Sequence, residues 1–368
     1  MDHLNKNIVT KNTNSAKIYN TNFVAAFYFF AFLSLVVFAF SSLSNILTPI
    51  AIAILIWFLI NGLANQIKRL PFMNSNLGEL ISIPLSLIII VALMFQIGSF
   101  IASSMVELSS TIAQLDDKFY LIIEKLSIMT GYDFSDKFEK LFEQFSIASL
   151  INKVIAAFSS IVSNIMQILL YVLFLLLDQR FFNAKINALF PNYENRAKAK
   201  DVLSSVSKSI RMYISITTII SLTTGFLTYL VCEALSLQGA VLWGFLAFIL
   251  NFIPTIGSII AVIIPTLFSL VQFPELSEVL LVLVFLALIQ FIIGNIIYPK
   301  LMGNKLNISQ FVVILSLVIW GAMWGTVGMF LSVPLMMILL IILSQFENTK
   351  SMAILISGDG KIYSKNKD

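Results

Sequence analysis

The chain is a succession of long apolar runs separated by short polar breaks. The first runs cover residues 23–43, 46–63 and 80–105, and another covers residues 151–177. Each is close to the roughly 20 residues that a helix needs to cross a bilayer. The brief polar break at residues 41–45 predicts a helical hairpin between the first two runs. The pattern therefore predicts an all-α polytopic membrane protein.

Two later apolar blocks, residues 238–273 and 308–343, are too long for one crossing, and each is interrupted near its middle. The first interruption, residues 251–257, contains Pro254, which cannot donate a helical hydrogen bond, and a glycine. The second, residues 320–328, is rich in glycine. We expect both blocks to be re-entrant or hairpin segments, giving about eight membrane segments in all. In lipid, such breaks persist only where protein buries them or where they line a wet cavity.

One polar insertion, residues 106–150, separates the third and fourth runs. Apolar residues in its first half, from Met105 to Met129, alternate steps of three and four, the spacing of a coiled-coil seam. Gly131 and Asp133 then suggest a turn before a returning helix. We predict an extramembrane helical hairpin, whose seam either packs the two helices together or mediates contacts in an oligomer.

Charge placement predicts the topology, because cytoplasmic loops are enriched in lysine and arginine. Basic residues flank residues 23–63, fill residues 179–211 and recur in the tail, while acidic residues predominate in residues 106–150. Both termini are therefore expected in the cytoplasm. The predicted parts are a polar N-terminus (1–22), three transmembrane helices (23–105), the extracytoplasmic hairpin (106–150), a transmembrane helix (151–178), a basic amphipathic segment (179–211), a transport core with broken helices (212–345) and a tail (346–368). The basic segment serves either as a lipid-attracting surface or as a mobile gate.

The amino-acid composition limits the kinds of functional site that the chain can form. Hydrophobic residues make up 58% of the 368 residues, charged residues only 11%, and mean hydropathy is +0.94. The only cysteine, Cys232, excludes an internal disulfide and a paired-cysteine metal site, and the only histidine, His3, lies in the polar N-terminus. We expect no enzyme activity, cofactor, metal or nucleic-acid partner, but instead membrane lipids and a small-molecule substrate.

Three sequence blocks resemble the signature blocks of the autoinducer-2 exporter family. They are Asn251-Phe-Ile-Pro-Thr-Ile-Gly-Ser258, Gly294-Asn-Ile-Ile-Tyr-Pro-Lys-Leu-Met-Gly303 and the stretch from Trp320 to Pro334. Their order and separation are similar as well. The resemblance implies a permease of the bacterial inner membrane that forms a homo-oligomer. Some relatives export the quorum-sensing signal autoinducer-2, whereas others are described as sodium or lithium/proton antiporters.

The residues expected along the substrate pathway are the polar and helix-breaking members of these blocks. They are Asn251, Pro254, Thr255, Gly257, Asn295, Pro299, Gly303, Trp320, Gly321, Gly325, Gly328 and Pro334. Each group also has a structural interpretation. Asn251 could cap the second half-helix, Asn295 to Gly303 could form a helix stop and turn, and Gly321 with Gly325 could form a helix-packing face.

The predicted membrane centre holds no charge, since Glu79, Glu107, Asp178 and Glu233 all fall near span ends. A cation/proton antiporter normally keeps a titrating carboxylate there. The sequence therefore favours export of a small neutral polar solute by alternating access around the two broken blocks, and the family resemblance implies autoinducer-2 as that solute. The alternatives are a sodium or lithium/proton antiporter and a non-transporting oligomeric scaffold.

Overall fold

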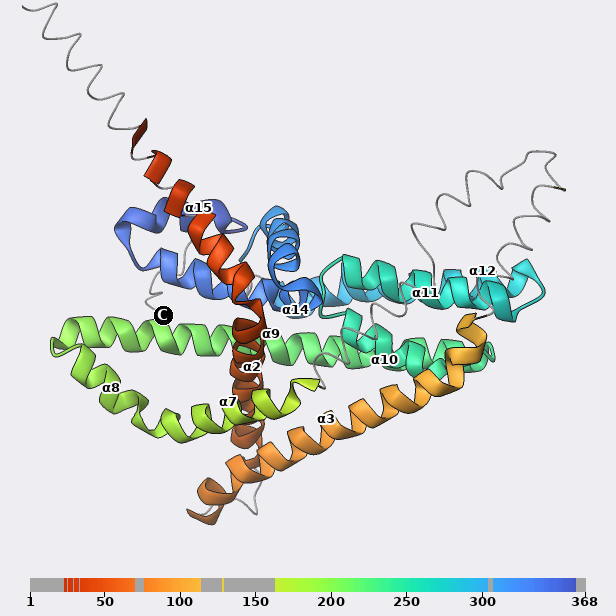
Figure 1. The fold of residues 1–368 in the computed structure, drawn as a ribbon, viewed down its shortest axis with the longest axis horizontal. Helices are drawn as coiled ribbons and strands as arrows, with labels where there is room; N and C mark the ends of the chain where they lie inside the picture. The colour runs from red at the N-terminus through yellow and green to blue at the C-terminus, as the bar shows by residue number, and fades with distance from the viewer. Residues whose placement is uncertain are drawn as a thin grey trace, which may run out of the picture. The chain divides into compact units, whose positions relative to one another are not determined.

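The computed structural model describes residues 23–69 (apart from 25, 29 and 33), 76–113, 128, 163–303 and 307–361. The regular elements in these ranges are helices, which confirms the all-α fold class. Figure 1 labels α2 (Ser44–Ile67), α3 (Asn76–Ala113), α7 (Ile165–Asp178), α8 (Phe182–Leu189), α9 (Tyr193–Ala234), α10 (Ala240–Leu250), α11 (Ile256–Gln272), α12 (Leu276–Ile292), α14 (Gln310–Ser344) and α15 (Lys350–Ile356). A π-helix (Ile293–Ile297) and α13 (Tyr298–Met302) follow α12.

Five helical stretches of the described residues are long and apolar enough to cross a membrane. They are Ser44–Ile67, Ile165–Leu189, Tyr193–Ala234, Leu276–Met302 and Gln310–Leu343. The buried share of their most apolar windows never exceeds 44%, so much of their apolar surface faces outward. Such surface needs lipid or another subunit to cover it. These helices support a multi-pass membrane protein, while the count of eight segments stays a prediction.

The chain divides into a compact unit ending at Thr48 and a second unit beginning at Pro49. In the first unit, Leu43 is a turn residue between two helical stretches: its amide donates to Ala39 O, its carbonyl oxygen accepts from Leu47 N, and α2 begins at Ser44. The hairpin expected between residues 23–43 and 46–63 stays a prediction.

Helices α9 and α10 touch backbone to backbone in the second unit. An added Cβ on Gly225 would lie 2.6 Å from Gly244 O, and one on Gly244 would lie 2.7 Å from Gly225 O. Only glycine at both positions permits this approach, as at other tight helix crossings in membranes. Helix α10, the first half of the first interrupted block, thus lies along α9 (Figure 1).

A central apolar cluster then joins this pair to the following helices. Trp243 of α10 and Phe268 of α11 are both buried, and their ring centroids lie 5.0 Å apart. Buried residues of α9, α12 and α14 complete the cluster. The Trp243 indole N–H donates to Gln238 O at 2.8 Å, so this large side chain is buried without an unpaired donor.

Two further clusters arrange the remaining helices. In the first, Phe58 of α2 packs with Tyr213 of α9, Met302 of α13 and Val333 of α14; we call it the α9–α13–α14 cluster. In the second, α2 packs with α3 and α7. Helix α3 continues past Met105 to Ala113, and beyond that the expected extramembrane hairpin lies outside the described residues, apart from residue 128.

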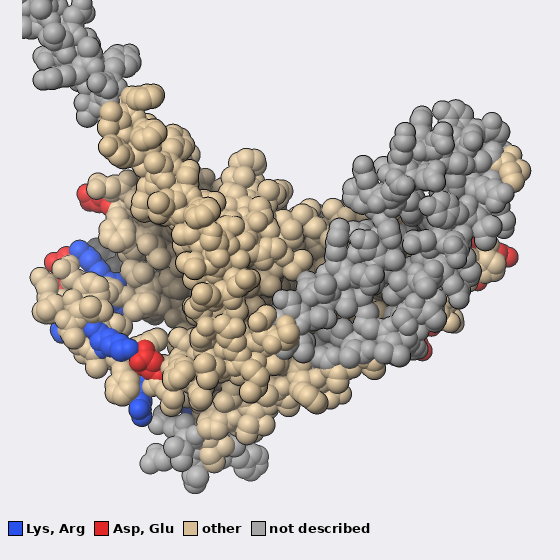
Figure 2. Space-filling view, viewed as in Figure 1, with Lys and Arg blue, Asp and Glu red and all other residues tan. Residues whose placement is uncertain are grey.

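The basic segment expected at residues 179–211 contains a bend followed by a long helix. Lys185 Nζ lies 2.6 Å from the Asp178 carboxylate across the bend, and Asn192 Oδ1 accepts the Glu194 amide at 2.8 Å as the N-cap of α9. Figure 2 shows basic side chains gathered over this α8–α9 connection, whereas most of the visible described surface is uncharged. Helix α9 then runs unbroken to Ala234, so the amphipathic segment and the next span are one helix.

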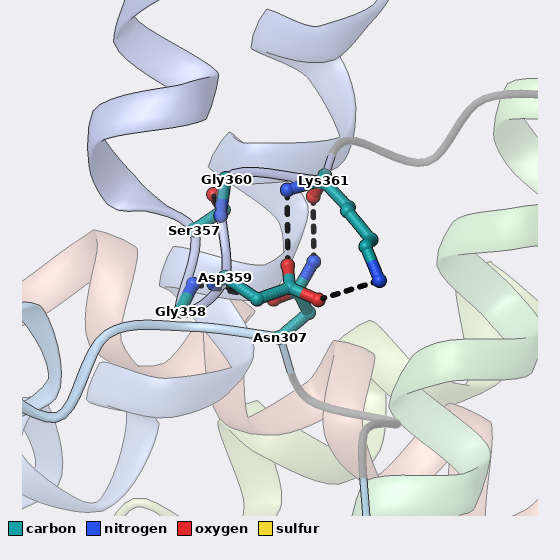
Figure 3. A network of polar contacts seen from close by, with 6 residues as sticks. All are labelled: Asn307, Ser357, Gly358, Asp359, Gly360 and Lys361. Carbon is teal, nitrogen blue, oxygen red and sulfur yellow. Dashed lines mark hydrogen bonds and ion pairs between the residues drawn. The ribbon is translucent and has the colours of Figure 1, made fainter.

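The segment before α14 is fastened to the chain after α15 (Figure 3). Asn307 Nδ2 donates to Lys361 O at 2.6 Å, and Asn307 Oδ1 accepts the amides of Gly358 and Asp359. Ile308 and Ser357 form an isolated antiparallel bridge beside these contacts. We call this arrangement the Asn307 clasp, and it holds the beginning of α14 in place.

Candidate functional site

The first interruption is a tight reversal between α10 and α11. Its hydrogen bonds shorten to a three-residue spacing, from Phe252 N to Ile249 O and from Ile253 N to Leu250 O. Pro254, which has no amide hydrogen, follows at the point where a helix would need another donor. The sequence thus ends α10 at Leu250 and starts α11 at Ile256.

Thr255 occupies a strained conformation at the tip of this reversal. Its φ of 62° and ψ of −58° place it in a γ-turn, closed by the hydrogen bond from Ile256 N to Pro254 O at 2.6 Å. A β-branched residue with positive φ is unusual, and such residues cost about 1–3 kcal/mol each. Strain of this kind clusters at functional sites, which makes the turn a candidate for binding or movement.

Gly257 allows the two half-helices to close on each other. A Cβ at this position would lie 1.7 Å from Leu250 O, a distance that no side chain can occupy. The residue is buried, and its amide donates to Ile253 O at 3.1 Å. Glycine is therefore required here by space.

Asn251 connects the reversal to α9. Its Nδ2 donates to Ser221 Oγ at 2.9 Å, and Ser221 is completely buried. Asn251 itself is half-buried. This contact satisfies one of the amide hydrogens, so the amide oxygen and the second hydrogen remain for other partners.

The second interruption is a sharper reversal inside α14. Gly325 has φ 62° and ψ −146°, a backbone region open essentially only to glycine. Ser316 Oγ then donates to Ser332 O at 3.1 Å, across sixteen residues of sequence. A straight helix would separate these residues by about 24 Å. The two arms of α14 consequently lie against each other.

Gly328 has the same role in this reversal that Gly257 has in the first. A Cβ on Gly328 would lie 1.9 Å from Trp320 O, and one on Gly321 would meet the Met329 side chain at 2.9 Å. The Trp320 and Trp324 rings lie with their centroids 5.0 Å apart on the first arm, tilted by 57° to each other. Pro334 is buried on the second arm, two residues beyond the Ser316 contact.

The two reversals meet. The Phe252 ring from the first stacks on the Phe330 ring from the second, with centroids 4.9 Å apart and planes inclined by 27°. Leu317 and Met329 of α14 also pack into the central cluster with residues of α10 and α11. The structure therefore brings the first and third sequence blocks into contact through residues that neighbour the candidates.

The candidate residues of the middle block lie on the surface of the described structure. Asn295, within the π-helix, is exposed, and its amide donates to Phe291 O at 3.1 Å. Pro299 is exposed in α13, and Gly303, with φ 50°, ends that helix. A π-helix at this point is itself notable, because single π-turns are frequent at functional sites.

The polar chemistry of the interior is uniform. In the described ranges, the polar groups of buried side chains are serine and threonine hydroxyls, together with the Tyr213 hydroxyl and the Trp243 indole N–H. These ranges contain no group of three or more His, Cys, Asp or Glu side chains that could hold a metal ion. The arrangement can offer hydroxyl and amide hydrogen bonds, with no buried full charge at the two reversals.

Comparison with known proteins identifies the family of this chain. Residues 24–348 match the family described as AI-2E family transporter. This chain belongs to the AI-2E family. The AI-2 transport protein TqsA of Escherichia coli (strain K12) is 32% identical over 85% of this chain and 90% of its own length.

Two other AI-2E relatives carry less specific names. A candidate transport protein of Haemophilus influenzae is 34% identical over 75% of this chain and 81% of its own length. YhhT of Escherichia coli (strain K12), named in the same way, is 28% identical over 67% of this chain and 70% of its own length. The expected family is thus confirmed, and the family is one of transporters.

Several features of this AI-2E chain were not singled out in the sequence. Ser221 is the partner of Asn251, and Phe252 and Phe330 join the reversals. A pattern could have pointed to Ser221, because small and hydroxyl residues recur on one face of α9. They are Thr217, Ser221, Thr224, Gly225 and Thr228, all of them buried. No signal in the sequence pairs the two phenylalanines.

Stacking of the two rings should be measurable as a coupling energy. Phe252→Ala and Phe330→Ala should each destabilise the AI-2E fold, and the double variant should lose less than the sum. The expected coupling is about 0.5–1.5 kcal/mol, the usual worth of an aromatic pair. Denaturant unfolding in detergent of the four proteins of the cycle would measure it, and strict additivity would contradict a direct contact. A second cycle, with Phe245→Ala in place of Phe252→Ala, provides a comparison for the coupling energy.

Proposed function

We propose that this chain exports a small neutral polar solute, with autoinducer-2 as the first solute to test, across the bacterial inner membrane. The observation that carries the proposal is the stacking of the two reversals at Phe252 and Phe330. Broken helices that meet within a bundle are the way in which many transporters build substrate sites. Half-helix ends leave free amides and carbonyls that a solute can use.

The proposed mechanism is alternating access around the two broken helical hairpins. Both α10–α11 and α14 enter as re-entrant or hairpin segments, and we propose that they do so from opposite faces. The strained Thr255 and the glycine-only Gly325 are the backbone points where the hairpins could pivot. Asn251 contributes the amide that recognises the solute beside Ser221.

The interior chemistry supports a neutral solute. Most of the buried side chains that can hydrogen-bond in the described ranges are serines and threonines, and their hydroxyls suit the hydroxyl and carbonyl groups of a polyol. The name of the relative TqsA, an AI-2 transport protein, supports autoinducer-2 in particular. Export of a solute made in the cell can run down its gradient, so the proposal requires no nucleotide and no ion relay.

The proposal also includes the setting of the protein. We place both termini in the cytoplasm, following the basic residues of the α8–α9 connection. We propose a homo-oligomer, since large apolar side chains such as Phe226, Phe291 and Phe311 are exposed on the single chain. Lipid covers the remaining apolar surface.

Flux measurements would test the function. Purified protein in liposomes loaded with autoinducer-2 should release it faster than protein-free liposomes, with or without a pH gradient. Release that appears only with a pH gradient would require coupling and would contradict the facilitated mechanism. Sodium/proton exchange without autoinducer-2 release would contradict the proposed function.

A cation/proton antiporter is the second candidate, and Glu278 is the observation that favours it. This half-buried residue opens α12, and its Oε2 is buried without a hydrogen-bond partner. An unpaired carboxylate oxygen is costly and could bind a cation or proton. Glu278 lies at a helix end, however, whereas the two reversals lie at the helix breaks.

The variant Glu278→Gln separates the two functions. Under the export proposal, Glu278→Gln should keep autoinducer-2 release within about twofold, because the amide preserves shape and the solute carries no charge. Under the antiporter alternative, the same variant should abolish sodium-dependent proton movement, read with a pH dye inside the liposomes. The exposed Glu275→Gln is the matched control, since it removes a neighbouring carboxylate from the same turn.

A further inference from the structure

Three hydroxyl side chains converge where α9 passes α13. Tyr213 and Thr217 lie one turn apart on α9 and expose only 3% and 1% of their surfaces. Tyr298, which is half-buried at the start of α13, packs against the α9–α13–α14 cluster beside Tyr213. Both tyrosine side chains lie close to that of Thr217, but no hydrogen bond of good geometry joins either of them to its hydroxyl.

Thr217 is the anomaly in this group. Its Oγ1 is buried and has no hydrogen bond of good geometry. Threonines in helices usually bond the carbonyl four residues earlier. Thr224 and Thr266 do so here, to Ile220 O at 2.9 Å and to Val262 O at 2.8 Å. An unpaired buried hydroxyl costs about 1–3 kcal/mol, so the position of Thr217 calls for a partner.

The π-helix fixes the direction of Tyr298. One π-turn adds a residue to the helix, which rotates everything after it by about 100° relative to a regular continuation of α12. Pro299 follows immediately and holds the start of α13. The irregular segment of the middle sequence block therefore serves to place a tyrosine near Thr217.

Tyr213 and Thr217 lie on the same face of α9 as Ser221, the partner of Asn251. Ser221, which accepts from Asn251, is one turn beyond Thr217, about 6 Å along the axis. The only charged side chain of this stretch of α9, Arg211, donates instead to Ser207 O. The described surroundings of the hydroxyls are the apolar residues of the α9–α13–α14 cluster, among them Phe58, Met302 and Met337.

We propose that Tyr213, Thr217 and Tyr298 form a second binding station, which receives hydroxyl groups of the transported solute on their way to or from Asn251. This inference rests on the proposed function. Three neutral hydroxyls can donate to and accept from a neutral polyol, while none supplies the full charge that an ion would need. Thr217 Oγ1 obtains its missing partner when the solute is present.

Thr217→Val is the decisive variant, because it keeps the shape of the side chain and deletes the hydroxyl. In liposomes with autoinducer-2 as the probe, it should raise KM at least fivefold, while the thermal unfolding midpoint stays equal or rises because an unpaired hydroxyl is removed. Thr217→Ser should restore KM. Thr224→Val is the matched control, since its hydroxyl is buried on the same helix but already bonded.

The outcomes separate the two proposals. If wild-type protein releases autoinducer-2 and Thr217→Val leaves both KM and kcat unchanged, the binding station is wrong and the exporter stands. If the variant raises the unfolding midpoint without changing KM, the hydroxyl bonds at most an ordered water, and the station is again wrong. If Thr224→Val raises KM equally, the effect is general to α9 and contradicts the assignment. Wild-type protein that releases no autoinducer-2 would overturn the proposed function itself.

Discussion

Replacing Gly257 with alanine should abolish the folded, transport-competent protein. The new Cβ would lie 1.7 Å from Leu250 O, and a backbone oxygen cannot move aside as a flexible side chain can. Opening the reversal would separate α10 from α11 and pull Phe252 from Phe330. We expect destabilisation at the upper end of the about 1–3 kcal/mol that overpacking costs, with loss of monodisperse protein in detergent.

The chain provides a matched control for this prediction. A methyl group added to Gly62, within α2, would meet no heavy atom within 4 Å, so Gly62→Ala should gain about 0.5–1 kcal/mol from the better helix former. Fluorescence-detected size-exclusion chromatography after heating would compare the variants. Equal thermal midpoints for Gly257→Ala and Gly62→Ala would refute the tight closure of the first reversal.

Replacing Asn251 with alanine should reduce autoinducer-2 release by about tenfold while the protein stays folded. The loss corresponds to about 1.4 kcal/mol, which is within the range of one hydrogen bond to the solute. The contact to Ser221 disappears as well, but a half-buried serine–amide bond contributes only about 0.5–1.5 kcal/mol to stability. Initial release rates over a range of internal concentrations would measure the effect.

Ser221→Ala distinguishes solute binding from structural support. This variant deletes the same hydrogen bond and leaves the Asn251 amide in place, so release should fall by no more than about twofold. A tenfold fall in both variants would mean that Asn251 acts only by holding the reversal to α9. The unfolding midpoints of the two variants should agree, since they lose the same contact.

The sequence pattern predicted the positions of the helix breaks better than it predicted the contacts around them. Proline lacks an amide donor and glycine reaches conformations closed to other residues, so Pro254 and Gly325 mark reversals from local chemistry alone. The stacking of Phe252 on Phe330 is a tertiary contact in a chain with 32 phenylalanines, and nothing local distinguishes these two.

Helix α9 shows another limit of a sequence pattern. Composition separates the basic segment from the next span, whereas hydrogen bonding along α9 continues regardless of which side chains face water or lipid. Composition predicts whether a residue faces water or lipid, whereas helix-breaking residues such as proline and glycine determine where a helix ends.

The Asn307 clasp imposes an order on the assembly of the chain. Asn307 precedes its partners Gly358 and Lys361 by 51 and 54 residues. Because synthesis runs from the N-terminus, both arms of α14 are made before the residues that close the clasp. The clasp is therefore among the last contacts that the chain can form, and it fixes the base of α14 only then.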